Sequence, residues 1–172
     1  MTRTALILVA FAGLSLWATA QDTTSTRVAT DIELLRTNRV LLDDLIDHGL
    51  QLSKAGGPLD RAVECRKAAA TLGLALKHAT DGTDDERVAE LSDYLTAVVR
   101  DALVPNFDQA RQGIPHGSQD YERLKKEADG AKKDLDALDE VFPTEGKLGH
   151  SGKVAEARRK LAEARSKIVV PE

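Results

Sequence analysis

An almost unbroken helical repeat of apolar residues is the feature that most constrains the fold of this 172-residue chain. From about Arg27 to Val169, apolar side chains recur at steps of three and four residues, the spacing of one face of an α-helix. No stretch of four or more residues alternates between apolar and polar side chains, as a half-buried strand would. Aromatic residues make up only 3% of the chain, so Leu, Val, Ile and Ala must supply the core. The sequence therefore predicts an all-α protein.

Turn residues such as Gly56-Gly57-Pro58 and Asp81-Gly82 divide this repeat into five helices. The expected helices cover residues 27–54, 59–79, 83–112, 118–142 and 151–169, each to within a few residues. We expect an antiparallel helical bundle in which three long helices (21–117) are followed by a C-terminal helical hairpin (118–172). The hairpin is expected to pack with the three-helix unit as one domain.

The third helix is expected to begin at a capping box formed by Thr83 and Glu86 and to continue through Pro105. The apolar steps run without interruption across the proline, which indicates a Pro-kinked helix rather than a loop. Leu72 and Leu95 lie centrally on the stripes of the second and third helices, so we expect them to face each other.

The first helix has the widest apolar surface. Its main stripe and the residues that widen it are Val28, Ile32, Leu35, Leu42, Ile46 and Leu50, with Leu34, Leu41, Leu45 and Leu52 beside them.

Residues 1–20 have the pattern of a secretory signal peptide. Arg3 provides a basic start, an apolar run follows, and Ala18-Thr19-Ala20 forms a small-residue cleavage site. We therefore expect cleavage after Ala20 and a periplasmic or secreted protein. Gln21 is not the cysteine that a bacterial lipoprotein requires, and no later apolar run is long enough to cross a membrane. With the lone Cys65 in place of several disulfides, this pattern favours a bacterial origin.

The sequence does not contain a complete motif for catalysis, metal binding or cofactor binding. It therefore predicts no catalytic, metal-binding or cofactor-binding residues. Covalent haem attachment needs Cys-x-x-Cys-His, whereas Cys65 precedes Arg66 and Lys67. The Glu-x-x-His pairs of di-iron bundles and the zinc motif His-Glu-x-x-His are missing, and residues 146–153 lack the spacing of a phosphate loop. These results favour a protein that is not an enzyme.

Two functional hypotheses follow. The first is an exported, non-enzymatic helical interaction or scaffold protein of the bacterial envelope. The alternative is a ligand-binding bundle that holds a metal, haem or small apolar molecule through His48 and His78. Asp43, Asp44 and Asp47 surround His48 in sequence, although such a cluster is more typical of a solvated helix face than of a metal site.

Charge is unevenly distributed over the predicted hairpin. Its last helix is rich in Lys and Arg, while the end of the preceding helix is acidic, so mutual pairing is the simpler interpretation. The more specific hypothesis is a basic patch that binds another envelope protein or an anionic surface, and not a nucleic acid. Its residues are Arg123, Lys125, Lys126, Arg165 and Lys167.

Overall fold

The computed structural model describes residue 32 and residues 34–171. The chain divides into two units, Met1–Val40 and Leu41–Glu172, which are treated separately below. The predicted signal peptide, its cleavage site and the start of the first predicted helix lie outside the described residues. The described residues are helical or in turns, without a strand, which confirms the all-α prediction.

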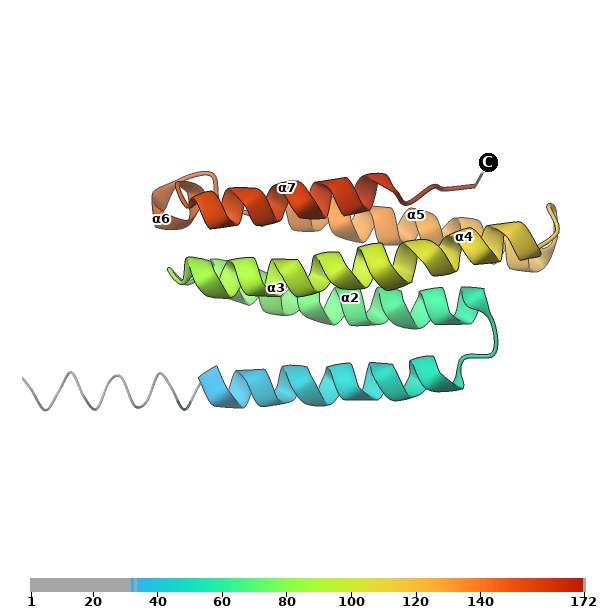
Figure 1. Ribbon diagram of the computed structural model, residues 1–172, viewed down its shortest axis with the longest axis horizontal. Helices are drawn as coiled ribbons and strands as arrows, with labels where there is room; N and C mark the ends of the chain where they lie inside the picture. The colour runs from blue at the N-terminus through green and yellow to red at the C-terminus, as the bar shows by residue number, and fades with distance from the viewer. Residues whose placement is uncertain (1–31, 33, 172) are drawn as a thin grey trace, which may run out of the picture. The chain divides into compact units, whose positions relative to one another are not determined.

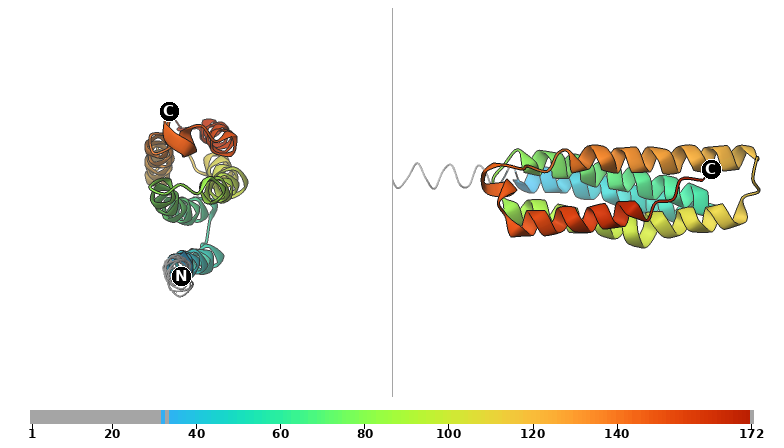
Figure 2. Two further views of the ribbon diagram at one scale, coloured as in Figure 1. Left: turned by 90° about the vertical axis from the view of Figure 1, so that its left-hand side faces the viewer. Right: turned by 90° about the horizontal axis from the view of Figure 1, so that it is seen from above.

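The second unit is built around four helical rods (Figure 1). These are α2 (Pro58–Thr80), a rod made of α3 (Asp85–Ala97), η1 (Val98–Leu103) and α4 (Val104–Gly113), then α5 (Gln119–Asp139) and α7 (Gly152–Ser166). Helix α2 packs against the α3–η1–α4 rod and α5, and α7 packs against α3 and α5. Viewed from the end, the four rods enclose a common centre (Figure 2). We call this arrangement the four-helix unit.

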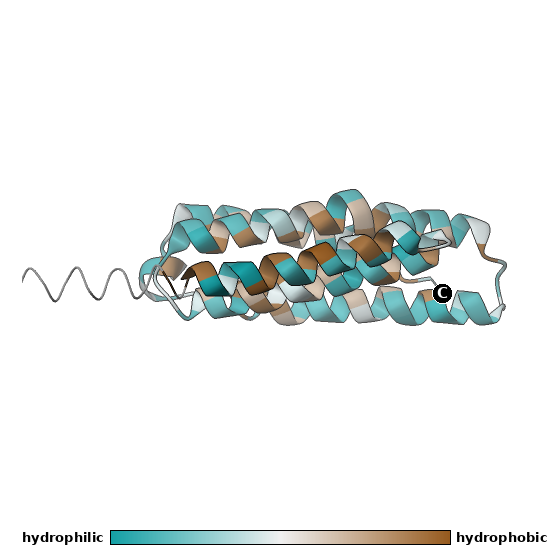
Figure 3. Cartoon of the chain, turned by 90° about the horizontal axis from the view of Figure 1, so that it is seen from below, coloured by the Kyte–Doolittle hydropathy of each residue, from teal (hydrophilic) through white to brown (hydrophobic). Residues whose placement is uncertain are grey.

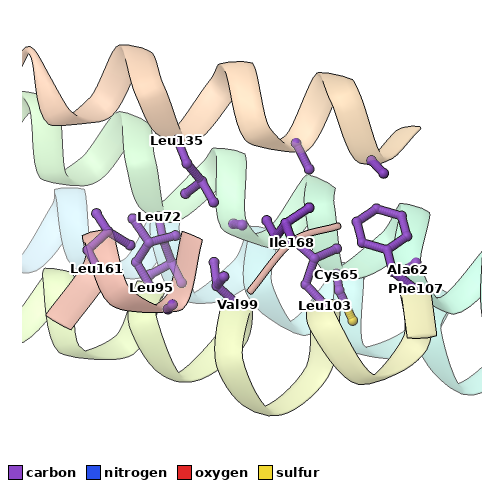
Figure 4. Packing of buried hydrophobic residues seen from close by; sticks show 14 of the residues in the cluster. Ala62, Cys65, Leu72, Leu95, Val99, Leu103, Phe107, Leu135, Leu161 and Ile168 are labelled. Atoms are coloured by element: carbon purple, nitrogen blue, oxygen red, sulfur yellow. The ribbon is translucent and has the colours of Figure 1, made fainter. Parts of the chain in front are cut away.

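Aliphatic residues fill the centre of the four-helix unit, as the shortage of aromatics requires. Leu72, Leu95 and Leu161 meet from three different rods (Figure 4), and Leu95 is fully buried. Small residues let the rods approach one another. A Cβ atom added at Gly73 would lie 2.7 Å from Leu138 Cδ1, so α2 and α5 are in direct contact at this point. The predicted hairpin therefore shares one core with the helices that precede it.

The rod from Asp85 to Gly113 passes through Pro105 without a break, as the apolar spacing predicts. Proline has no N–H and its ring crowds the carbonyl of the preceding turn. Here the preceding turn is a π-helix, in which the Val104 N–H bonds the carbonyl of Val99, five residues back. Asn106 Nδ2 donates to the Ala102 carbonyl at 2.8 Å, and its Oδ1 accepts from Arg61 Nε at 2.9 Å. The wide turn and this side chain let the helix continue.

Several boundaries differ from the predicted ones. The N-cap of α3 is Asp84, whose carboxylate accepts from the Arg87 N–H at 3.0 Å, and not Thr83. Helix α5 ends at Asp139, before Phe142, and α7 ends at Ser166, before Val169. The predicted loop between them contains a single helical turn, α6 (Gly146–Gly149).

Helical residues 34–54 precede the four-helix unit and end at Lys54, as predicted. Of these, residues 41–54 belong to the second unit and run alongside α2 (Figures 1 and 2). We call residues 41–54 the outer segment. No helix among the described residues is long and apolar enough to cross a membrane.

Candidate interaction surfaces

The outer segment contacts the four-helix unit through one of its faces. Leu41, Leu45 and Leu52 are half-buried and pack against the core. His48 lies on the same side, with its Nε2 3.1 Å from Thr71 Oγ1 on α2. This face therefore attaches the segment to the bundle.

A second apolar face of the outer segment is turned to solvent. Leu42, Ile46 and Leu50 are 57%, 59% and 52% exposed, and we call these three residues the outward stripe. With about 100° per residue, the outward stripe is centred about 120° around the helix axis from the buried leucines. In Figure 3 this segment lies nearest the viewer, and several of its turns carry the brown of hydrophobic residues. A run of three large aliphatic side chains at helical spacing is the typical form of a helix-docking surface.

Acidic side chains lie beside the outward stripe. Asp43 and Asp47 are exposed and lie about 60° and 100° around the helix axis from the centre of the stripe. Gly49 also adjoins the stripe, and a Cβ atom added there would meet nothing within 4 Å. The surface is thus apolar along its centre, acidic along its edge, and open to close approach.

The two histidines of the ligand-binding alternative lie on neighbouring helices but in different settings. His48 faces α2, whereas His78 is exposed near the end of α2. The described residues contain no group of three or more His, Cys, Asp or Glu side chains that could hold a metal ion. Asp43, Asp44 and Asp47, which surround His48 in sequence, are exposed, whereas His48 is half-buried.

Three residues of the predicted basic patch have carboxylate partners within the chain. Arg123 Nη1 lies 3.0 Å from Asp60 Oδ1 on α2, and Lys167 Nζ lies 3.4 Å from Glu163 Oε1. Arg165 pairs with Asp136 on α5. These pairs reduce the positive charge available to a partner.

Lys125 and Lys126, the other two patch residues, are exposed on α5. An anionic partner at this patch would therefore depend mainly on these two lysines.

Three other basic residues of α7 connect it to two neighbouring helices. Lys153 Nζ and Lys160 Nζ lie 2.6 and 3.0 Å from Glu86 and Asp93 of α3. Arg158 binds Asp139 of α5 through two hydrogen bonds of 2.8 and 2.9 Å, which lower the pKa of the Asp139 carboxyl. The acidic end of α5 and the basic helix after it thus pair with each other in part, as the simpler interpretation of the sequence holds.

The lone thiol is part of the core. Cys65 is 3% exposed and lies among the buried residues of α2 (Figure 4). Its burial raises the pKa of the thiol, so the reactive thiolate is disfavoured. Such a side chain behaves as a small apolar residue.

Comparison with protein-family models, curated proteins and solved structures finds no match to this chain.

The outward stripe is the surface that the sequence pattern did not single out. Its residues were recognised as apolar and helical, but a stripe of this kind normally faces the core. The available signal was the width of the apolar surface, which is too great for contact with one neighbouring helix.

Proposed function

We propose that this chain is an exported, non-enzymatic helical interaction or scaffold protein of the bacterial envelope. The observation that supports it most is the outward stripe. Fully burying one Leu or Ile side chain stabilises a protein by about 1.5–3 kcal/mol. Because Leu42, Ile46 and Leu50 are each more than half exposed, the stripe retains roughly 2.5–5 kcal/mol of burial energy for a partner.

The outward stripe is distinct from ordinary surface exposure. Single exposed apolar residues are common on soluble proteins and need no partner. Here three occur one helical turn apart on a segment that is already attached to the bundle through a different face. The arrangement provides binding energy without any requirement for chemical catalysis.

The proposal is tested by photo-crosslinking in the native compartment. A photoreactive amino acid is placed at Ile46 in one variant and at Leu74 in the control. Leu74 is 62% exposed on α2 but lies outside the stripe. Discrete crosslinked products from position 46, and none from position 74, are expected. Equal labelling at both positions, or none at position 46, would contradict a specific interaction surface.

The exposed lysines Lys125 and Lys126 support a second, weaker contact with an anionic surface or partner protein. Charge reversal to Glu at both positions tests it. Loss of salt-dependent binding to vesicles containing phosphatidylglycerol is expected, and unchanged binding would remove this surface from the proposal.

A further inference from the structure

We propose that the outer segment is a detachable arm, which opens from α2 around the connection at Gly56 and Gly57 while the four-helix unit stays folded. This is a conformational property of the chain itself, and it goes beyond the proposed function because it needs no partner. The outer segment and the four rods are held in place in different ways, and this difference supports the proposal.

Burial distinguishes the outer segment from the rods. Helix α7, which has 15 residues and is similar in length, contributes four buried residues to the core. No residue from 41 to 54 is buried to the same degree: Leu41, Leu45, His48 and Leu52 are half-buried, and the others are exposed. In Figure 2 the outer segment lies outside the four rods. It therefore packs on the surface of the four-helix unit and does not complete its core.

The face of α2 that meets the outer segment consists of small side chains. Thr71 marks this face, because its Oγ1 lies 3.1 Å from His48 Nε2. Ala68 lies three residues before Thr71, and Ala75 and Ala79 lie four and eight residues after it, so all share one face of the helix. They are half-buried. Because alanine and threonine side chains are small, opening would expose little apolar surface on the four-helix unit.

The connection between the outer segment and α2 is not packed against the rest of the protein. A Cβ atom added at Gly56 or Gly57 would meet nothing within 4 Å. Glycine also adopts more backbone conformations than other residues. Helix α2 itself starts firmly, because Pro58 opens it and the Arg61 N–H bonds the Gly57 carbonyl at 3.0 Å. Rotation at the two glycines can therefore move the outer segment without disturbing α2.

Opening changes the apolar surface that the outer segment presents. While the segment is attached, the outward stripe is its exposed apolar face. Once it is open, Leu41, Leu45 and Leu52 reach solvent as well. Together the two faces cover about half of the helix circumference. Isolated helices shorter than about 12–15 residues are marginal in water. An open arm therefore loses its helical hydrogen bonds unless something binds it.

Native-state hydrogen exchange measures this opening. Purified full-length protein exchanges in increasing urea concentrations below the unfolding transition, and exchange is followed by mass spectrometry. Residues 41–54 should exchange through an opening at least about a hundredfold more populated than the unfolding of α5 and α7. This opening should depend little on urea, because it exposes little surface. Exchange of residues 41–54 with the same population and urea dependence as α5 and α7 would overturn the proposal.

Two variants show whether the contact with α2 controls the opening. Leu45→Ala shortens a half-buried side chain at this contact and should raise the open population by about tenfold or more. The control Leu42→Ala makes the same change at a residue that is 57% exposed, and it should alter the open population by less than about threefold. Exchange of α5 and α7 should be unchanged in both variants. Equal effects of the two variants, or an effect of Leu45→Ala that extends to α5 and α7, would also overturn the proposal.

Discussion

Replacing Leu72 with alanine should destabilise the protein much more than the same change at Leu74, two residues further along α2. Leu72 is 2% exposed and lies between the rods, whereas Leu74 is 62% exposed. Leu72→Ala removes the equivalent of about three buried methylene groups, or about 2.4 kcal/mol of transfer energy. The cavity left behind adds to this, because the neighbouring helices can close it only in part. We expect a total loss of about 3–4 kcal/mol.

Leu74→Ala is the matched control, since the helix and the chemical change are the same. About two fifths of the Leu74 side chain is out of contact with water, which limits the lost transfer energy to about 1 kcal/mol. The higher helix propensity of alanine returns about 0.2 kcal/mol. The expected loss is therefore below about 1 kcal/mol.

Urea denaturation followed by far-ultraviolet circular dichroism measures both variants. The denaturant dependence of the unfolding free energy should be unchanged, since the surface exposed on unfolding is nearly the same. A difference of less than about 1 kcal/mol between the two variants would refute the assignment of Leu72 to the core and Leu74 to the surface.

Three further predictions address other parts of the chain. Leu95→Ala should cost about 2–4 kcal/mol in the same assay, because Leu95 is fully buried on α3; a loss under about 0.5 kcal/mol would contradict its place in the core. Mass spectrometry of the exported protein should show a chain that begins at Gln21, and an intact Met1 would disprove the signal peptide. Asp139→Asn should lower stability at pH 7 by at most about 1 kcal/mol, since the pair with Arg158 is partly exposed. Because that pair lowers the folded-state pKa of Asp139, the wild-type advantage should be complete above the unfolded-state pKa of about 4 and should disappear as the pH falls through the lower folded-state value. An advantage that persisted at the acid end of the titration would contradict this assignment.

The helices could be predicted from the sequence because apolar spacing is a local property. The clearest example is Pro105, where a rule about single residues suggests a break and the surrounding pattern indicates continuity. The structure follows the pattern, with η1 and the Asn106 side chain accommodating the proline. The cap of α3 was misplaced by one residue because Thr83 and Asp84 are both good capping residues. The backbone conformation at the turn places the Asp84 carboxylate, and not the Thr83 hydroxyl, within reach of the Arg87 N–H.

The surfaces were harder to predict because they depend on which helices meet. Arg123 and Arg165 are neutralised by Asp60 and Asp136, acids on other helices that no local pattern identifies as partners. In the same way, the spacing of Leu42 shows that it shares a helix face with Ile46 and Leu50, but not whether that face meets α2 or solvent. That depends on how the helix packs on the bundle, and the packing buries part of Leu41, Leu45 and Leu52 instead.

Hydrogen–deuterium exchange in the absence and presence of envelope extract tests the central claim, that the outward stripe is a contact surface. Exchange is followed by mass spectrometry in peptides from residues 41–54 and from α2 to α7. We expect protection of residues 41–54 to increase when the extract is added, while protection of the four-helix unit stays constant. Protection of residues 41–54 that the extract leaves unchanged would contradict the claim.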